Sequence, residues 1–148
     1  MKLLSPAISS LARMRLWRIE AWKNNPLDAQ REVLQDLVTS AQYTEFGRKY
    51  NFSQLFNVRA FKDAVSIHEY NDLKPYIERI MNGEQNILWN TPIYWFAKSS
   101  GTTSDKSKFI PVSDETLKDS HYKAVNDVLT MYYQFNPESS LLTGKGLL

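Results

Sequence analysis

The chain has 148 residues, of which 43% are hydrophobic and 23% are charged, a composition that suits a compact domain and excludes wholesale disorder. A formal net charge of +2 is too small to indicate nucleic acid as a main partner, and the lack of cysteine excludes disulfides, thiolate metal sites and a cysteine nucleophile. The opening residues include Pro6, several serines and Arg13, so they predict neither a signal peptide nor a membrane span, and we expect a cytoplasmic protein.

The first 25 residues predict a basic helix. Apolar residues recur at helical spacing, and the segment holds five Lys or Arg residues against one Glu. Such an excess is typical of a solvated helix face and less often marks a surface that binds a membrane or an anionic partner. Asn25 and Pro26 predict that this helix stops and a second one begins, and the apolar spacing extends the second helix to about Ala41.

Several later positions predict where the other helices of the first 90 residues begin or end. Gly47, in TEFGRKY, is expected to end the second helical region. A short helix is predicted over residues 58–65, and another is predicted to begin around Pro75. Asn82 followed by Gly83 is typical of a left-handed C-cap, so this last helix is expected to end there.

Beyond these helices the pattern changes to strands. TPIYWFA and KFIPV are short aromatic and β-branched runs on either side of a polar loop. Ser113 is expected to begin a long helix that runs to about Phe135. The chain is thus predicted to be an α/β protein that is mostly helical, with helices over about 1–90 and a strand–loop–strand–helix segment over about 91–148.

The loop between the two strands, SSGTTSDKSK, consists almost entirely of Ser, Thr and Lys residues. Phosphate groups are bound by converging backbone N–H groups, hydroxyls and ammonium groups, and Gly101 permits a close approach of the backbone. A polar hairpin tip that only faces solvent would have the same composition, so composition leaves both interpretations open. The chain has no Walker A motif, because Gly144 and Lys145 follow Ser139 where the first glycine would stand.

An ordered set of motifs in this chain resembles one known family. SSGTTSDKSKFIP is similar to the first nucleotide-binding motif of the adenylate-forming superfamily, and more narrowly to that of the auxin-responsive acyl-acid amido synthetases in their bacterial branch. TEFGRKYNF, FKDAVSIHEYNDLKPYIERIMNGEQNILW and FAKSSGTT follow in the order and at the spacing of that family, so the resemblance covers almost the whole chain. The chain departs from the family at Asp105, where a glycine is common.

This resemblance implies an ATP-dependent ligase that acts on a carboxylic acid and an amine or amino acid, with Mg²⁺ as cofactor. The carboxylate would attack the α-phosphorus of ATP to give an acyl-adenylate and pyrophosphate, and the amine would then attack the acyl carbon to give an amide and AMP. Lys108 would be the catalytic residue that stabilises charge on the departing pyrophosphate. The residues implied to bind the phosphates are Ser99, Ser100, Gly101, Thr102, Thr103 and Ser104.

The same comparison implies that residues 1–148 are the N-terminal part of an adenylate-forming large domain. The family's later motifs, for adenine, ribose and the catalytic metal, do not occur before Leu148. We therefore expect a fragment that is inactive as a ligase on its own, and we assign no metal ligands within it. Two alternatives stay open: a stand-alone phosphate- or nucleotide-binding module, and a helical interaction protein that docks through its basic first helix.

The remaining notable residues have structural interpretations. The two histidines are isolated, so neither is expected to bind a metal. An apolar stripe on the helix from Ser113 is expected to belong to the core, although the resemblance places a helix of the acyl-acid pocket here. The tryptophans are expected to be core anchors rather than base-stacking platforms. The histidines are His68 and His121, the stripe comprises Leu117, His121, Ala124, Val125, Val128 and Tyr132, and the tryptophans are Trp17, Trp22, Trp89 and Trp95.

Overall fold

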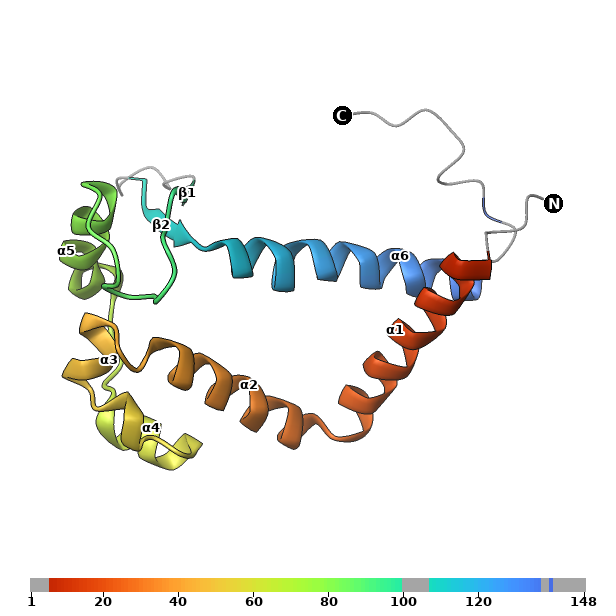
Figure 1. The fold of residues 1–148 in the computed structure, drawn as a ribbon, viewed down its shortest axis with the longest axis horizontal. Coiled ribbons are helices and arrows are strands. Elements are labelled where there is room, and N and C mark those ends of the chain that lie inside the picture. Colours follow the sequence, from red (N-terminus) through yellow and green to blue (C-terminus); the bar gives the residue numbers. More distant parts are fainter. Residues whose placement is uncertain (1–5, 100–106, 137–138, 140–148) are drawn as a thin grey trace. The chain divides into compact units, whose positions relative to one another are not determined.

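The computed structural model of the chain consists of two compact units, here called the terminal unit and the central unit. Both are built mainly of helices, and the central unit also holds one pair of strands, so the prediction of a mostly helical chain with a small sheet is confirmed (Figure 1). The terminal unit spans residues 1–26 and 118–148, the central unit spans 27–117, and the structure describes residues 6–99, 107–136 and 139.

The terminal unit pairs α1 (Pro6–Asn24) with α6 (Lys123–Phe135), which contact each other (Figure 1). Arg15 of α1 forms a bidentate ion pair with Asp127 of α6, in which Nη2 donates to Oδ2 at 2.7 Å and Nε donates to Oδ1. Its guanidinium also lies 5.0 Å from the ring centre of Trp22. The hydrogen bond to Asp127 raises the pKa of Arg15, so the charged pair fixes the two helices to each other.

Asn25 separates α1 from the next helix, as the sequence predicts. Its backbone N–H and its side-chain amide both donate to the carbonyl of Ala21, at 3.0 and 3.3 Å, and the next helix begins at Pro26. The central unit then adds four further helical elements. In chain order its helical elements are α2 (Pro26–Ala41), α3 (Glu45–Lys49), the 3₁₀ turn η1 (Phe52–Gln54), α4 (Val58–Ala64) and α5 (Tyr70–Met81).

Helix α5 begins before Pro75, so the predicted start was wrong. The backbone N–H of Glu69 donates to the Asp72 carboxylate at 2.8 Å, and the N–H of Asp72 donates to the Glu69 carbonyl at 3.0 Å. These bonds pair N–H groups that the first turn of the helix would otherwise leave without partners, and they make Tyr70 the first helical residue. They are a stronger start signal than Pro75, which lies within the helix.

The predicted end of α5 is confirmed. Gly83 has φ +97°, its N–H donates to the Ile80 carbonyl, and the N–H of Glu84 donates to the Arg79 carbonyl, both at 3.0 Å. This pair of bonds is a Schellman motif, which requires a left-handed residue just after the helix. A glycine adopts that conformation without the steric penalty that other residues incur.

Gly47 lies in the middle of α3, so the prediction that it ends a helix was wrong. Thr44, with 0% of its surface exposed, begins this helix: its hydroxyl donates to the Ala41 carbonyl at 2.7 Å and accepts from the Gly47 N–H at 2.9 Å. A Cβ atom at position 47 would lie 2.0 Å from the Ala41 carbonyl oxygen. The glycine is thus required by the close approach of α3 to the end of α2, rather than by a turn.

Two apolar clusters form the core of the central unit, and the half-buried Trp89 packs against both. The helical cluster joins α2 to the segment that follows α3, and the isoleucine cluster joins α5 to the segment that leads into the strands. Phe96, in the strand pair, packs against the isoleucine cluster, so this cluster ties α5 to the strands. The buried residues of the first cluster are Val38, Ala41, Phe52 and Leu55, and those of the second are Ile80, Ile87 and Ile93.

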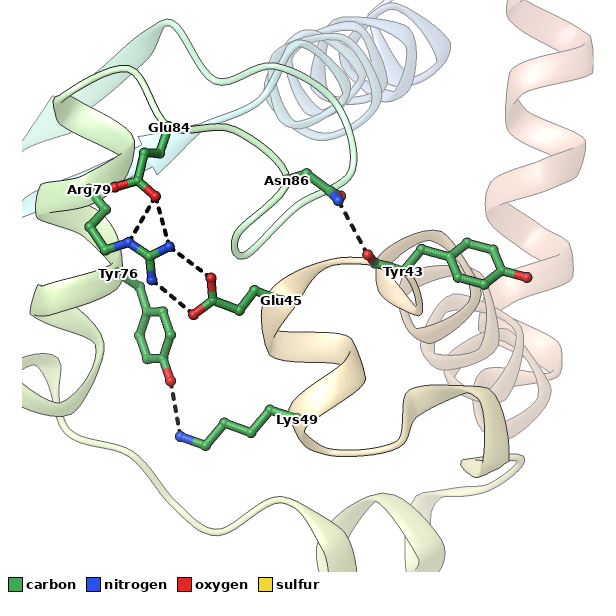
Figure 2. Close-up of polar contacts among 7 residues, drawn as sticks. All are labelled: Tyr43, Glu45, Lys49, Tyr76, Arg79, Glu84 and Asn86. Atoms are coloured by element: carbon green, nitrogen blue, oxygen red, sulfur yellow. Dashed lines mark hydrogen bonds and ion pairs between the residues drawn. The ribbon is translucent and has the colours of Figure 1, made fainter.

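A polar cluster on one side of this core, the Arg79 cluster, consists of Arg79, Glu45 and Glu84 (Figure 2). The guanidinium donates to both carboxylate oxygens of Glu45 at 2.8 Å and to Glu84 at 2.7 and 3.0 Å. The backbone N–H groups of Glu45 and Phe46 donate to the carbonyls of Asn86 and Ile87 at 3.0 Å. Two of the family-like motifs, TEFGRKYNF and FKDAVSIHEYNDLKPYIERIMNGEQNILW, are therefore held together by charge and backbone pairing.

The Arg79 cluster predicts how stability depends on pH. Hydrogen bonds from Arg79 lower the pKa of Glu45 and of Glu84. A carboxyl with a lowered pKa in the folded state stabilises the fold above its unfolded pKa, about 4.3, and that stabilisation is lost as pH falls through the folded pKa. We expect the unfolding temperature of the wild type to exceed that of Arg79→Gln near neutral pH, and the difference to shrink below about pH 4.3.

Circular dichroism melts of both proteins across this range measure the effect. A difference that stays constant down to the acid limit would contradict the assignment of these ion pairs.

Three of the four tryptophans are not core anchors, which corrects the sequence prediction. Trp17, Trp22 and Trp95 are 72%, 46% and 63% exposed. Trp17 lies two residues from Arg15, about 200° around the helix from the side chain that binds α6. Trp95 precedes Phe96, which packs on the isoleucine cluster, so alternation along the strand directs Trp95 to the opposite face.

The apolar stripe of the last helix was also predicted wrongly as core. Val125, Val128 and Tyr132 are 49%, 62% and 40% exposed. The reason is the ion pair between Asp127 and Arg15, which turns the Asp127 side of α6 toward α1. Val128 is the next residue, so its side chain points about 100° around the helix axis from that side. Within the part of the chain that the structure describes, no helix combines the length and apolar character needed to cross a bilayer.

Candidate phosphate-binding site at the strand pair

The two predicted strands form an antiparallel pair that frames the polar loop. Strand β1 (Trp95–Lys98) pairs with β2 (Phe109–Val112) so that Lys98 stands opposite Phe109. One residue beyond this ladder, the N–H of Ser99 donates to the Lys108 carbonyl at 2.9 Å, and the N–H of Lys108 donates to the Ser99 hydroxyl oxygen at 3.2 Å. The strand pair thus brings the two ends of the predicted phosphate loop into direct contact.

The structure therefore places Ser99 and Lys108 together at the base of the loop. A hydroxyl that accepts one hydrogen bond can still donate its own proton, so Ser99 can serve the strand pair and an anion at once. Lys108, the residue just before β2, adds an ammonium group. The other predicted phosphate-binding residues, Ser100, Gly101, Thr102, Thr103 and Ser104, lie outside the described residues.

Tyr70, which sequence reasoning did not select, contacts this base from helix α5. Its hydroxyl lies 3.0 Å from the backbone nitrogen of Phe109 and 3.3 Å from the Phe109 carbonyl oxygen. The Lys108 ammonium lies 5.6 Å from the centre of the Tyr70 ring. Tyr70 lies 39 residues from Phe109 in the sequence, so no local motif could have indicated this contact.

The segment after β2 is anchored by a separate polar group. The buried Ser113 begins the helix as predicted, because its hydroxyl accepts from the Thr116 N–H at 3.1 Å. Glu115 accepts from the Trp89 indole N–H at 3.3 Å and from the Thr91 hydroxyl at 2.9 Å. A hydrogen bond from its own backbone N–H, with those of the neighbouring side chains, lowers the pKa of Glu115. The carboxylate therefore holds the helix start against the segment that leads into β1.

The helix that follows differs in one respect from the expected regular helix. It ends at Phe135, as predicted, but the stretch Thr116–Tyr122 (η2) is π-helical before α6 begins at Lys123. A π-helical stretch is an irregularity that periodic apolar spacing does not reveal.

His68 has the structural surroundings that its isolation in the sequence predicts. Its Nε2 lies 2.8 Å from the Tyr50 hydroxyl, and its Nδ1 lies 2.6 Å from the Ser66 carbonyl. Its ring packs at 5.7 Å from that of Phe46, while His121 is exposed and packs beside Tyr122. Across residues 6–99, 107–136 and 139, no three acidic or histidine side chains form a group that could hold a metal ion.

The central unit is a mostly helical domain whose strand pair frames a loop rich in Ser, Thr and Lys residues, and comparison with known proteins identifies its family. The sequence profile of the GH3 family N-terminal domain matches residues 15–148. The chain therefore belongs to the GH3 family.

Curated relatives in this family are named as amido synthetases. Indole-3-acetic acid-amido synthetase GH3.2 of Arabidopsis thaliana is 33% identical over 132 residues, which cover 87% of this chain and 23% of that protein. Jasmonoyl-L-amino acid synthetase JAR6 of Nicotiana attenuata is 36% identical over 104 residues, or 68% of this chain and 18% of that protein. The chain thus spans less than a quarter of the length of these relatives.

A solved structure agrees with these relatives. AtGH3.15 acyl acid amido synthetase in complex with 2,4-DB aligns with a TM-score of 0.73 and 28% identity, over 83% of this chain and 21% of that one. The expected fold, a mostly helical chain with a small sheet like the N-terminal part of an acyl acid amido synthetase, is therefore confirmed.

Proposed function

We propose that this chain is the phosphate-binding N-terminal part of an ATP-dependent ligase that joins a carboxylic acid to an amine or amino acid. The observation that carries the proposal is the contact of Ser99 with Lys108 at the base of the loop. This arrangement supplies a hydroxyl and an ammonium group from the residues that flank the two strands, and both groups are donors that bind phosphate. The family relatives named as amido synthetases support the reaction class.

In the proposed reaction the acid is activated by adenylation. A carboxylate oxygen attacks the α-phosphorus of ATP, the bond to the bridging oxygen breaks, and pyrophosphate leaves with the electron pair. The amine then attacks the acyl carbon, loses a proton and displaces AMP. Mg²⁺ would accompany ATP and neutralise phosphate charge, and no residue of the described chain is assigned to it.

The chain's own contribution to this reaction is positioning and charge stabilisation. Lys108 stabilises the negative charge that develops on the departing pyrophosphate, and Ser99 donates a hydrogen bond to the phosphate oxygens. The remaining loop residues, Ser100 to Ser104, are proposed to add hydroxyl and backbone donors around Gly101. The exposed apolar face of α6 is the surface proposed to contact the acyl group.

ATP–pyrophosphate exchange with a panel of carboxylic acids tests this function. The 148-residue chain is expected to bind ATP without catalysing exchange, and a natural protein that continues beyond Leu148 is expected to catalyse it with at least one acid. The proposal would be overturned if both proteins failed to bind ATP and failed to catalyse exchange. ATP binding with no exchange in the natural protein would instead favour a stand-alone nucleotide-binding module.

A further inference from the structure

We propose that Tyr70 is a positioning residue for the phosphate groups, acting through Lys108 and through the first residue of β2. This inference rests on the proposed function, because it concerns the same base of the loop. Tyr70 has two contacts there: its hydroxyl meets both backbone polar atoms of Phe109, and its ring lies 5.6 Å from the Lys108 ammonium. The Tyr70 side chain therefore contacts both the backbone of Phe109 and the charged group of the preceding residue, Lys108.

The hydroxyl contact follows from the pattern of the strand pair. In an antiparallel ladder, hydrogen-bonded and non-hydrogen-bonded pairs alternate. Ser99 and Lys108 form a bonded pair, so at the next pair, Lys98 and Phe109, the N–H and carbonyl of Phe109 point away from β1. Tyr70 accepts from that N–H at 3.0 Å and is 3.3 Å from that carbonyl, to which it donates. The outer edge of β2 is thereby fixed where the loop ends.

The ring contact restricts the lysine. A lysine side chain has four rotatable carbon–carbon bonds, and a cation is attracted to the face of an aromatic ring within about 6 Å. Lys108 is half-buried, so its ammonium is held near one position rather than spread through solvent. A fixed ammonium loses less conformational freedom when it binds a phosphate, which strengthens binding.

Tyr70 is itself well anchored. It is the first residue of α5, next to the paired Glu69 and Asp72, and α5 buries Ile77 and Ile80 in the core. Because α5 is anchored in the core, it holds Tyr70 at a fixed position beside the base of the loop. A tyrosine at a flexible site could not have this effect.

The chain offers a matched control in the same helix. Tyr76 also pairs with a lysine: its hydroxyl accepts from the Lys49 ammonium at 2.9 Å, and that ammonium lies 5.5 Å from its ring centre. Figure 2 shows this pair beside the Arg79 cluster, where the Tyr76 hydroxyl bonds to a residue of α3 rather than to the strand pair. Tyr76→Phe therefore removes a similar hydroxyl without touching the loop.

The test is calorimetric titration of the 148-residue chain and its variants with inorganic pyrophosphate. We expect Tyr70→Phe to weaken binding about tenfold, the value of one to two hydrogen bonds, and Tyr76→Phe to bind like the wild type. Tyr70→Leu should weaken binding further, since it also removes the ring. In a Lys108→Ala background the difference between Phe and Leu at position 70 should vanish, because the ring acts through Lys108.

The outcomes separate this inference from the proposed function. If the wild type binds pyrophosphate, Lys108→Ala weakens binding and both Tyr70 variants bind like Tyr76→Phe, the positioning role is overturned and the phosphate site stands. If neither the 148-residue chain nor a natural protein that continues beyond Leu148 binds pyrophosphate or ATP, the proposed function fails and the inference fails with it. Should Tyr70→Leu unfold, Tyr70→Phe decides, because it preserves the shape and the ring.

Discussion

Gly47→Ala is expected to destabilise the central unit by about 3 kcal/mol, near the upper end of the usual cost of overpacking. The added Cβ would lie 2.0 Å from the Ala41 carbonyl oxygen and 2.9 Å from its carbon, distances that van der Waals radii do not allow. Both atoms belong to the backbone at the end of α2, so no side-chain rotation can relieve the clash. The start of α3 and the hydrogen bonds of Thr44 would have to move. Urea unfolding followed by circular dichroism measures the loss.

Gly83→Ala is the matched control, because it separates a clash from a backbone penalty. Gly83 has φ +97°, and a Cβ there meets nothing within 4 Å. Alanine at this position should therefore cost only about 1 kcal/mol, the penalty for a left-handed conformation. Equal losses at positions 47 and 83 would show that close packing of α3 against α2 is not what Gly47 provides.

Lys108→Ala is expected to reduce adenylation about 10²-fold, or roughly 2.7 kcal/mol of transition-state stabilisation, in a protein that catalyses the proposed reaction. The ammonium would be lost where charge develops on the departing pyrophosphate, while the backbone pairing with Ser99 would remain. Because charge increases during the step, kcat should fall more than the affinity for ATP. Initial rates of ATP–pyrophosphate exchange at several ATP concentrations separate the two.

Lys98→Ala provides the control for net charge. Lys98 stands on β1 opposite Phe109, is exposed and has no assigned role at the loop. We expect its replacement to leave kcat within about twofold of the wild type, as for surface changes away from a site. Equal losses in the two variants would mean that general positive charge, rather than the position of Lys108, supports the reaction.

Much of the helical framework could be predicted because local signals fix the ends of helices. Asn25 with Pro26, Asn82 with Gly83, and Ser113 each act through bonds to residues within four positions. The error at Gly47 arose where a contact between two helices decides, whereas the start of α5 was missed although its bonds join Glu69 and Asp72, three residues apart. Gly47 is required by the carbonyl of Ala41, and no sequence pattern distinguishes a glycine needed for packing from one needed for a turn.

The candidate site was predictable in part for the same reason. Ser99 and Lys108 lie at the two ends of one contiguous polar loop, so composition and motif order indicated both. Tyr70 was missed because its contacts depend on how α5 packs beside β2, two elements that the sequence separates widely. Trp89 was the one tryptophan correctly expected in the core; its neighbours in the helical cluster are distant in sequence, whereas Ile87 and Ile93 of the isoleucine cluster lie within four residues of it.

Residue-resolved NMR of the 148-residue chain during titration with pyrophosphate tests the central claim most directly. We predict saturable shifts of backbone amides confined to residues 99–108 and their contact at Phe109, with the Tyr70 amide following. Shifts that are absent, or that concentrate on the basic residues Arg13, Arg15 and Arg18 of α1 instead, would contradict a phosphate site at the strand pair.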